Sequence, residues 1–103
     1  MRAELLWWEG CPSHPETLAD LERVLAEEGV DAEVELVEVV SDEQAREQHF
    51  PGSPTVRLDG VDAIPPAETE PFSLTCRVYR LRDGRISATP DPDDLREAVR
   101  STK

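Results

Sequence analysis

The segment covering residues 3–29 reads AELLWWEGCPSHPETLADLERVLAEEG. Its first part, residues 3–8, is apolar on both faces, which is typical of a covered strand in the middle of a sheet. From about residue 14 to residue 28 the apolar side chains fall at helical spacing, and Gly29 is a helix stop signal. A central strand leading into an amphipathic helix is therefore expected. The inward positions of this helix are Leu18, Leu21, Val24 and Leu25.

The rest of the chain alternates strand and helix patterns. Residues 31–40 begin by alternating acidic and apolar side chains, which predicts an edge strand with Val34 and Leu36 facing inward. We further expect a short helix at 41–48 capped by Ser41, strands at 55–58 and 61–64, a loop at 65–71, strands at 74–81 and 85–88, and a helix at 91–101. The β-α-β start requires two parallel strands with a right-handed crossover.

These elements predict one α/β domain spanning residues 1–103, with a central mixed sheet flanked by helices and a hairpin inserted before the last helix. The chain has 11 basic and 23 acidic side chains, a formal net charge of −12. Such a charge repels nucleic acids and anionic membranes, so we expect neither as a partner. No apolar run can span a bilayer and no secretory signal is recognised, which favours a cytoplasmic protein.

Cys11 is the main candidate for chemistry because it lies in the turn EGCPSH, residues 9–14, where the first strand leads into the first helix. A thiol there lies near unpaired N–H groups and the positive end of the helix dipole, which favour the thiolate. His14 follows about one helical turn later, where its ring can exchange a proton with the sulfur. We therefore expect Cys11 to be exposed and reactive.

A second interpretation of the same turn stays open. Ser13 and Glu16 match a capping box, with Ser13 as the cap of the helix. Cys11 would then precede the cap by two positions, and the helix dipole would act on it less. In that case Cys11 would be a structural thiol.

The chain resembles the thioredoxin/glutaredoxin superfamily. The resemblance is carried by the apolar strand, the Gly10-Cys11-Pro12 turn, the helix, and SPTV at 53–56 before LDG at 58–60. It covers roughly residues 3–64 and the final helix, and residues 65–89 look like an insertion. More narrowly, the chain is similar to short bacterial thioredoxin-like proteins that carry a Gly-Cys-Pro turn and lack the second motif cysteine. The resemblance implies a thioredoxin-like fold.

The resemblance also implies roles for particular residues. Cys11 would attack a disulfide as the thiolate. The role of His14, to stabilise or protonate sulfur, follows from its position in the turn and not from the family. Pro54 would be the family's cis-proline, and Pro12, Ser53 and Pro54 would bind the substrate, with the Ser53–Pro54 backbone pairing with it. The family motif is Cys-x-x-Cys, whereas His14 occupies the position of the second cysteine. The motif therefore cannot resolve its own mixed disulfide.

Cys76 is the second cysteine of the chain and a possible resolving thiol. It can form a disulfide only if its Cα comes within about 7 Å of that of Cys11. On its predicted strand Cys76 alternates with Arg77 and Tyr79 and shares a face with Val78. Because free cysteines are often buried, we expect a core thiol here and a small thiol such as glutathione as the resolving agent.

Metal binding has less support. The chain offers two thiols and two imidazoles as possible ligands of zinc or a soft metal, but they lack the spacing of a metal motif. We therefore expect no bound metal, and His49 reads as a loop residue. The two thiols and two imidazoles considered as metal ligands are those of Cys11, Cys76, His14 and His49.

Two further groups have competing interpretations. A local run of arginines either holds an anionic thiol such as glutathione or balances the acidic side chains, and we favour charge balance. Trp7 and Trp8 are expected in the core, one to each face of the sheet, rather than as a stacking platform. The local run of arginines consists of Arg77, Arg80, Arg82 and Arg85.

The sequence therefore predicts thiol–disulfide exchange through a single motif cysteine, Cys11 in a Cys-x-x-His turn. The expected partner is a small thiol or a disulfide-bearing protein. No cofactor is expected, because the glycines have no dinucleotide or phosphate-binding spacing. The alternative is a non-catalytic thioredoxin-fold module that binds a protein partner or a soft metal ion such as mercury.

Overall fold

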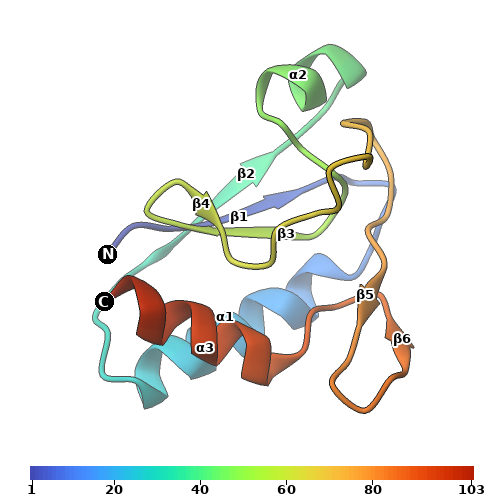
Figure 1. Ribbon diagram of the computed structural model, residues 1–103. Helices are drawn as coiled ribbons and strands as arrows, with labels where there is room; N and C mark the ends of the chain where they lie inside the picture. The colour runs from blue at the N-terminus through green and yellow to red at the C-terminus, as the bar shows by residue number, and fades with distance from the viewer.

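The chain forms the helices and strands shown in Figure 1, and the computed structural model describes all of residues 1–103. In chain order the elements are β1 (Ala3–Trp7), α1 (His14–Glu27), β2 (Val34–Glu38), α2 (Asp42–Glu47), β3 (Thr55–Leu58), β4 (Val61–Asp62), β5 (Tyr79–Arg80), β6 (Ile86–Ser87) and α3 (Pro92–Thr102). The predicted order is confirmed, including the hairpin before the last helix. None of the helices combines the length and the apolar character needed to cross a bilayer.

A four-stranded sheet with the order β2-β1-β3-β4 forms the centre of the fold. β1 pairs with β2 in parallel and with β3 in antiparallel orientation, so the sheet is mixed. The prediction of a central first strand and an edge second strand is confirmed. One detail of it is wrong: Leu36, expected to face inward, is 49% exposed and packs in neither core.

Both faces of β1 are covered, as its apolar sequence predicts. Leu5 belongs to the larger core, in which residues of the sheet pack against α1 and α3. Leu6 points to the other face and packs in a smaller core with Val39, Ala45 and Phe50. The turn at the end of β1 is therefore anchored on both sides of the sheet.

The two tryptophans at the end of β1 differ from the prediction. Trp7 and Trp8 are only half-buried and belong to neither buried core. The reason is their position at the end of the strand, where the chain leaves the sheet and fewer neighbours surround them. Trp8 packs partly against the smaller core, and Trp7 stacks on a side chain of α1.

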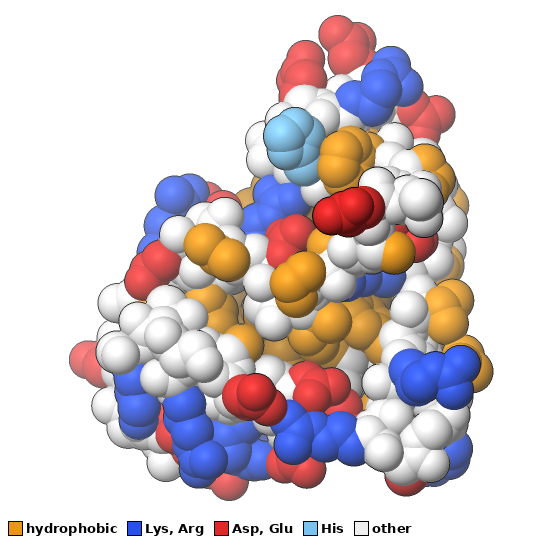
Figure 2. Space-filling model, viewed as in Figure 1, with side chains coloured by type: hydrophobic (Ala, Val, Ile, Leu, Met, Phe, Trp, Pro, Cys, Tyr) orange, Lys and Arg blue, Asp and Glu red, His pale blue; other side chains and the backbone are white.

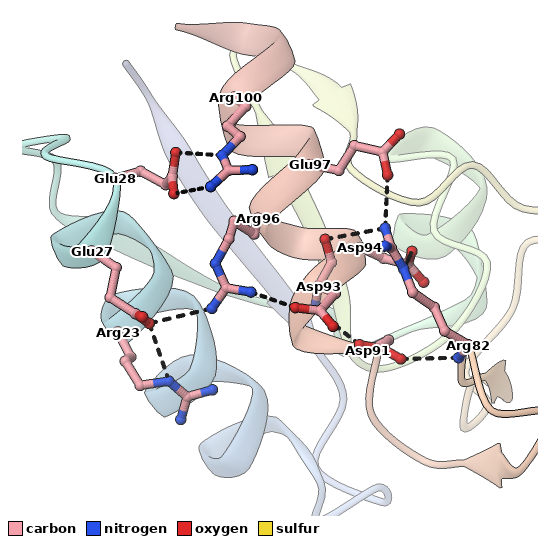
Figure 3. Close-up of polar contacts among 10 residues, drawn as sticks. All are labelled: Arg23, Glu27, Glu28, Arg82, Asp91, Asp93, Asp94, Arg96, Glu97 and Arg100. Carbon is pink, nitrogen blue, oxygen red and sulfur yellow. Dashed lines mark hydrogen bonds and ion pairs between the residues drawn. The ribbon is translucent and has the colours of Figure 1, made fainter.

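Helices α1 and α3 lie side by side under the sheet, and ion pairs join them at the surface (Figures 1 and 3). Arg96 lies 3.4 Å from Glu27, and Arg100 lies 2.8 Å from Glu28. The hydrogen bond from Arg100 lowers the pKa of Glu28 below its usual value. Because surface ion pairs contribute little free energy, the apolar contacts between the helices and the sheet supply most of the stability.

Two of the four clustered arginines balance acidic side chains. Arg82 lies 2.8 Å from Asp94 and 2.7 Å from Glu97, both on α3, and Arg85 lies 2.7 Å from Asp83. Charge balance against an acidic helix is therefore confirmed for Arg82, whereas Arg85 pairs with Asp83 in its own turn. The contacts of Arg82 also fix the β5–β6 hairpin to the start of α3 (Figure 3).

The segment predicted as a strand over residues 74–81 is regular only at β5. Residues before β5 form an isolated parallel bridge, in which Cys76 lies opposite Ser53. The inserted region is therefore attached to the loop that precedes β3. This attachment brings together residues that are far apart in the sequence.

Candidate functional site

Cys11 is buried, with 2% of its surface exposed, so the expectation of an exposed thiol is wrong. The cap position of α1 is Ser13, and Cys11 precedes it by two residues. The Cys11 N–H donates to the Trp8 carbonyl at 3.0 Å, which places the cysteine in a separate turn. Because Cys11 lies outside the first turn of α1, the helix dipole acts on it less than expected. This is the helix start that the capping-box interpretation implies, although the Ser13 side chain makes no cap hydrogen bond.

The sulfur of Cys11 has two polar neighbours. Its S–H donates to the Ser53 carbonyl oxygen at 3.5 Å, and the Ser13 hydroxyl lies 3.4 Å away. A carbonyl can only accept a hydrogen bond, so the sulfur is the donor in the contact with Ser53. The Ser13 hydroxyl makes no cap hydrogen bond to the helix and is able to donate to a thiolate. The sulfur therefore has a suitable partner in either protonation state.

His14 is directed to the first strand. Its ring stacks on that of Trp7, with 4.2 Å between the centroids and 18° between the planes. No hydrogen bond joins it to Cys11, and its Nδ1 atom is buried without a partner. His14 is the first residue of α1, and its ring faces β1 because it stacks on Trp7 at the end of that strand. The structure thus does not show the pairing of His14 with sulfur that the sequence predicts.

The loop before β3 contains a cis peptide bond between Ser53 and Pro54, as predicted. The backbone of Ser53, expected to pair with a substrate, is already paired with the chain itself. Its N–H donates to the Thr75 carbonyl at 2.8 Å, and its carbonyl accepts from the Arg77 N–H at 2.8 Å. Pro54 is buried, whereas Pro12 is exposed beside the cysteine turn. An incoming peptide therefore finds no free backbone group on Ser53.

Cys76 is exposed, and the prediction of a buried core thiol is wrong. The alternation of the segment is as expected, but its inward face is the one that carries Arg77 and Tyr79, which are 7% and 5% exposed. Val78 on the other face is 67% exposed. Tyr79 offers the larger apolar area, so burying it turns Cys76 and Val78 outward.

The two thiols interact. Cys76 lies opposite Ser53 in the bridge, and the carbonyl of the same Ser53 accepts from the Cys11 sulfur. Hydrogen bonding with Cys11, followed by burial and by the charge of Cys11, raises the pKa of Cys76 to about 11. Two interacting thiols lose their protons in succession, and the raised value describes the second loss. Cys76, a possible resolving thiol by its sequence, therefore lies near Cys11.

Two side chains anchor the Cys76 segment from inside, and the sequence analysis missed both. The Tyr79 hydroxyl donates to the Pro54 carbonyl at 2.5 Å, and burial raises the pKa of this tyrosine to about 12. The guanidinium of Arg77 lies 4.6 Å from the centre of the Tyr79 ring and donates to the Ile64 carbonyl. The sequence signal that could have located this anchor is the aromatic side chain of Tyr79, which alternates with Val78 and so lies on the opposite face of the segment.

The remaining candidates lie elsewhere. His49 is exposed and stacks on Phe72, with 5.1 Å between the ring centroids. No group of three or more His, Cys, Asp or Glu side chains is arranged to hold a metal ion. The four possible ligands named by the sequence are therefore not gathered into one site, although Cys11 and Cys76 are neighbours.

The largest hollow of the surface lies away from the cysteines. It has a volume of about 450 Å³ and lies between β4 and α3, with Leu58, Val61 and Ile64 among its apolar residues. Figure 2 shows hydrophobic side chains gathered on this face of the molecule. Neither cysteine lines this hollow.

Comparison of the chain with known protein families, with curated proteins and with solved structures finds no match.

Proposed function

We propose that the protein carries out thiol–disulfide exchange and that Cys11 and Cys76 form its redox pair. The observation that carries the proposal is the position of Ser53, which accepts a hydrogen bond from Cys11 and is bridged to Cys76. A thioredoxin-like fold is part of the proposal. It is supported by the mixed sheet, the cysteine turn before α1, and the cis Ser53–Pro54 bond before β3.

The reaction transfers two electrons from the cysteine pair to a disulfide. A thiolate of the pair attacks one sulfur of the disulfide, breaks its S–S bond and releases one half, which takes up a proton. The second cysteine loses its proton and attacks the mixed disulfide. This step forms the Cys11–Cys76 bond and releases the other half as a thiol. A cellular thiol such as glutathione returns the pair to the dithiol by the reverse exchange.

The titration of the pair suits this reaction. Once one proton has left, the pKa of about 11 keeps the second proton on the pair over the physiological range. A thiolate and a thiol then lie side by side, so an attacking group and a proton donor are present together. The Ser13 hydroxyl, 3.4 Å from the Cys11 sulfur, is placed to stabilise negative charge on that atom. This arrangement takes the place of the predicted role of His14.

Mass spectrometry after mild oxidation tests the proposal. With oxidised glutathione, the wild-type protein should lose two hydrogen atoms and carry no attached glutathione. The Cys11→Ser variant should retain glutathione as a mixed disulfide on the exposed Cys76, whereas the Cys76→Ser variant, whose remaining thiol is buried, should retain little. A variant lacking both cysteines is the control for other modifications. A wild-type protein that accumulates as a stable mixed disulfide would contradict the proposed pair.

The proximity of the two thiols also favours a second candidate function, the binding of a soft metal ion. Two thiolates are suitable ligands for ions such as Cu(I) or mercury. Titration with Cu(I) against a chromophoric chelator should then show one ion per protein, with the affinity lost in both Cys11→Ser and Cys76→Ser. Equal affinity of the wild type and the single-cysteine variants would exclude a shared site.

A further inference from the structure

We propose that residues 73–79, here called the strap, occupy the place of an extended peptide on the Ser53 loop and so confine exchange to small disulfides that reach Cys76. This inference rests on the proposed function. It names the substrate class and the residues that impose it, of which Tyr79 and Arg77 are positioning residues. The argument follows from backbone pairing, side-chain anchors and the exposure of the two sulfurs.

The strap uses the backbone groups that an extended peptide would need. Peptides in extended conformation bind proteins by pairing with free N–H and C=O groups at a sheet edge. On Ser53 both groups are already bonded, to the Thr75 carbonyl and to the Arg77 N–H, each at 2.8 Å. Pro54 has no N–H to offer. A polypeptide substrate must therefore displace the strap before it can pair beside Cys11.

The strap is anchored on both sides of Cys76. Before the cysteine, the Leu74 N–H donates to the Asp42 carboxylate at 3.0 Å. After it, the Tyr79 hydroxyl donates to the Pro54 carbonyl at 2.5 Å. Arg77 covers the Tyr79 ring and is itself only 7% exposed. Because these contacts act at both ends, the strap does not open by the movement of one end alone.

The closed strap leaves one sulfur accessible. Cys11 is 2% exposed behind the Ser53 loop, whereas Cys76 is on the outer face of the strap. A small disulfide needs only an accessible sulfur and no backbone pairing. Cys76 attacks as its proton passes to the neighbouring Cys11 thiolate, which gives a mixed disulfide on Cys76 and releases the other half as a thiolate that takes up a proton from solvent. Cys11 then loses its proton and attacks the Cys76 sulfur, which forms the Cys11–Cys76 bond. The strap thus makes Cys76 the entering thiol.

The experiment compares two neutral disulfides that carry the same leaving group. One is bis(2-hydroxyethyl) disulfide, and the other is a short extended peptide whose central cysteine bears a 2-hydroxyethylthio group. The rate of Cys11–Cys76 disulfide formation with each is divided by the rate of the same probe with an unstructured thiol. We expect the wild type to prefer the small probe by at least about tenfold, as an obstructed site requires.

Loosening the strap should admit the peptide. Tyr79→Phe keeps the ring and removes one buried hydrogen bond, so the preference should fall by about threefold to tenfold. Asp42→Ala releases the other end from a surface position and should shift the preference in the same direction. Val99→Ala, in the core between α1 and α3, destabilises the protein without touching the strap and should leave the preference unchanged.

The outcomes separate the two proposals. If neither probe produces the Cys11–Cys76 disulfide, the proposed function fails. If both probes produce it at equal normalised rates, the function stands and the role of the strap is refuted. A preference that survives unchanged in both Tyr79→Phe and Asp42→Ala also refutes that role.

Discussion

The α1–α3 side of the sheet and the cysteine region are held together by different interactions. On the helical side, apolar side chains such as Leu21 and Leu95 are fully buried, and ion pairs join α3 to the end of α1 at the surface (Figure 3). The cysteine region, which consists of the turn at residues 9–14, Ser53–Pro54 and residues 73–79, depends on backbone hydrogen bonds to Ser53 and on polar anchors. Four buried side-chain polar atoms lack a hydrogen-bond partner: those of Trp7 and Ser53, and those of His14 and Thr17 in the first turn of α1, next to the cysteine turn.

Two parts of one small domain are thus stabilised by different kinds of contact. Unpaired buried polar atoms reduce stability, and proteins retain them mainly where function requires particular groups. The larger apolar core lies on the helical side, and the proposed exchange site lies where buried polar atoms are unpaired. If the two parts are independent, mutations in one region should leave the other largely unaffected.

The largest expected effect is on stability. Leu21→Ala removes a fully buried side chain from the core between α1 and the sheet. It should lower the free energy of unfolding by about 2–5 kcal/mol, because a cavity remains and apolar burial is lost. Urea unfolding measures this change. The alkylation rate of Cys76 in the folded protein should stay at the wild-type value, and a large increase would show that the two regions are not independent.

A smaller effect is expected on the titration of the thiols. In Cys11→Ala, Cys76 loses the hydrogen bond and the charge that hold its pKa near 11, so the pKa should fall toward the ordinary value of 9.0. The thiolate of Cys76 then forms at lower pH than in the wild type. Thiolate absorbance followed through a pH titration measures the shift. A midpoint that stays near 11 without Cys11 would show that the two thiols do not interact.

The smallest effect is expected at the surface between α1 and α3. The pKa of Glu28 is lowered in the folded protein, mainly by the hydrogen bond from Arg100. Glu28 therefore contributes stability above its unfolded pKa of about 4.5, and this contribution is lost as the pH falls through the lower folded value. Glu28→Gln should reduce stability slightly at neutral pH and weaken its decrease in acid. Thermal unfolding at several pH values tests this, and Glu22→Gln on an exposed position of α1 is the control.

Much of the fold could be predicted because its elements have strong local patterns. The apolar strand at residues 3–8 and the amphipathic helix after it were located correctly, as was the edge position of β2. The cis bond before Pro54 also agreed with the prediction. The strand expected at 74–81 was mostly wrong, because residues 75–77 pair with a distant loop instead of with a neighbouring strand.

The site was predicted less well than the fold. Cys11 was expected to be exposed and Cys76 buried, and the structure shows the reverse. Alternation along a strand identifies two faces but does not say which face meets the protein. Here the decision depends on Tyr79, whose hydroxyl finds its acceptor on Pro54, 25 residues away in the chain. Local sequence contains no information about that acceptor.

The sequence alone determined the order of the elements, the parallel start of the sheet, and the presence of a cysteine at the first turn, because periodicity and turn residues act over a few neighbouring positions. Only the tertiary structure decided that Ser53 would bind the chain's own segment and set Cys76 beside Cys11. That outcome depends on hydrogen bonds and burial between distant segments. Such contacts exist only once the chain has folded.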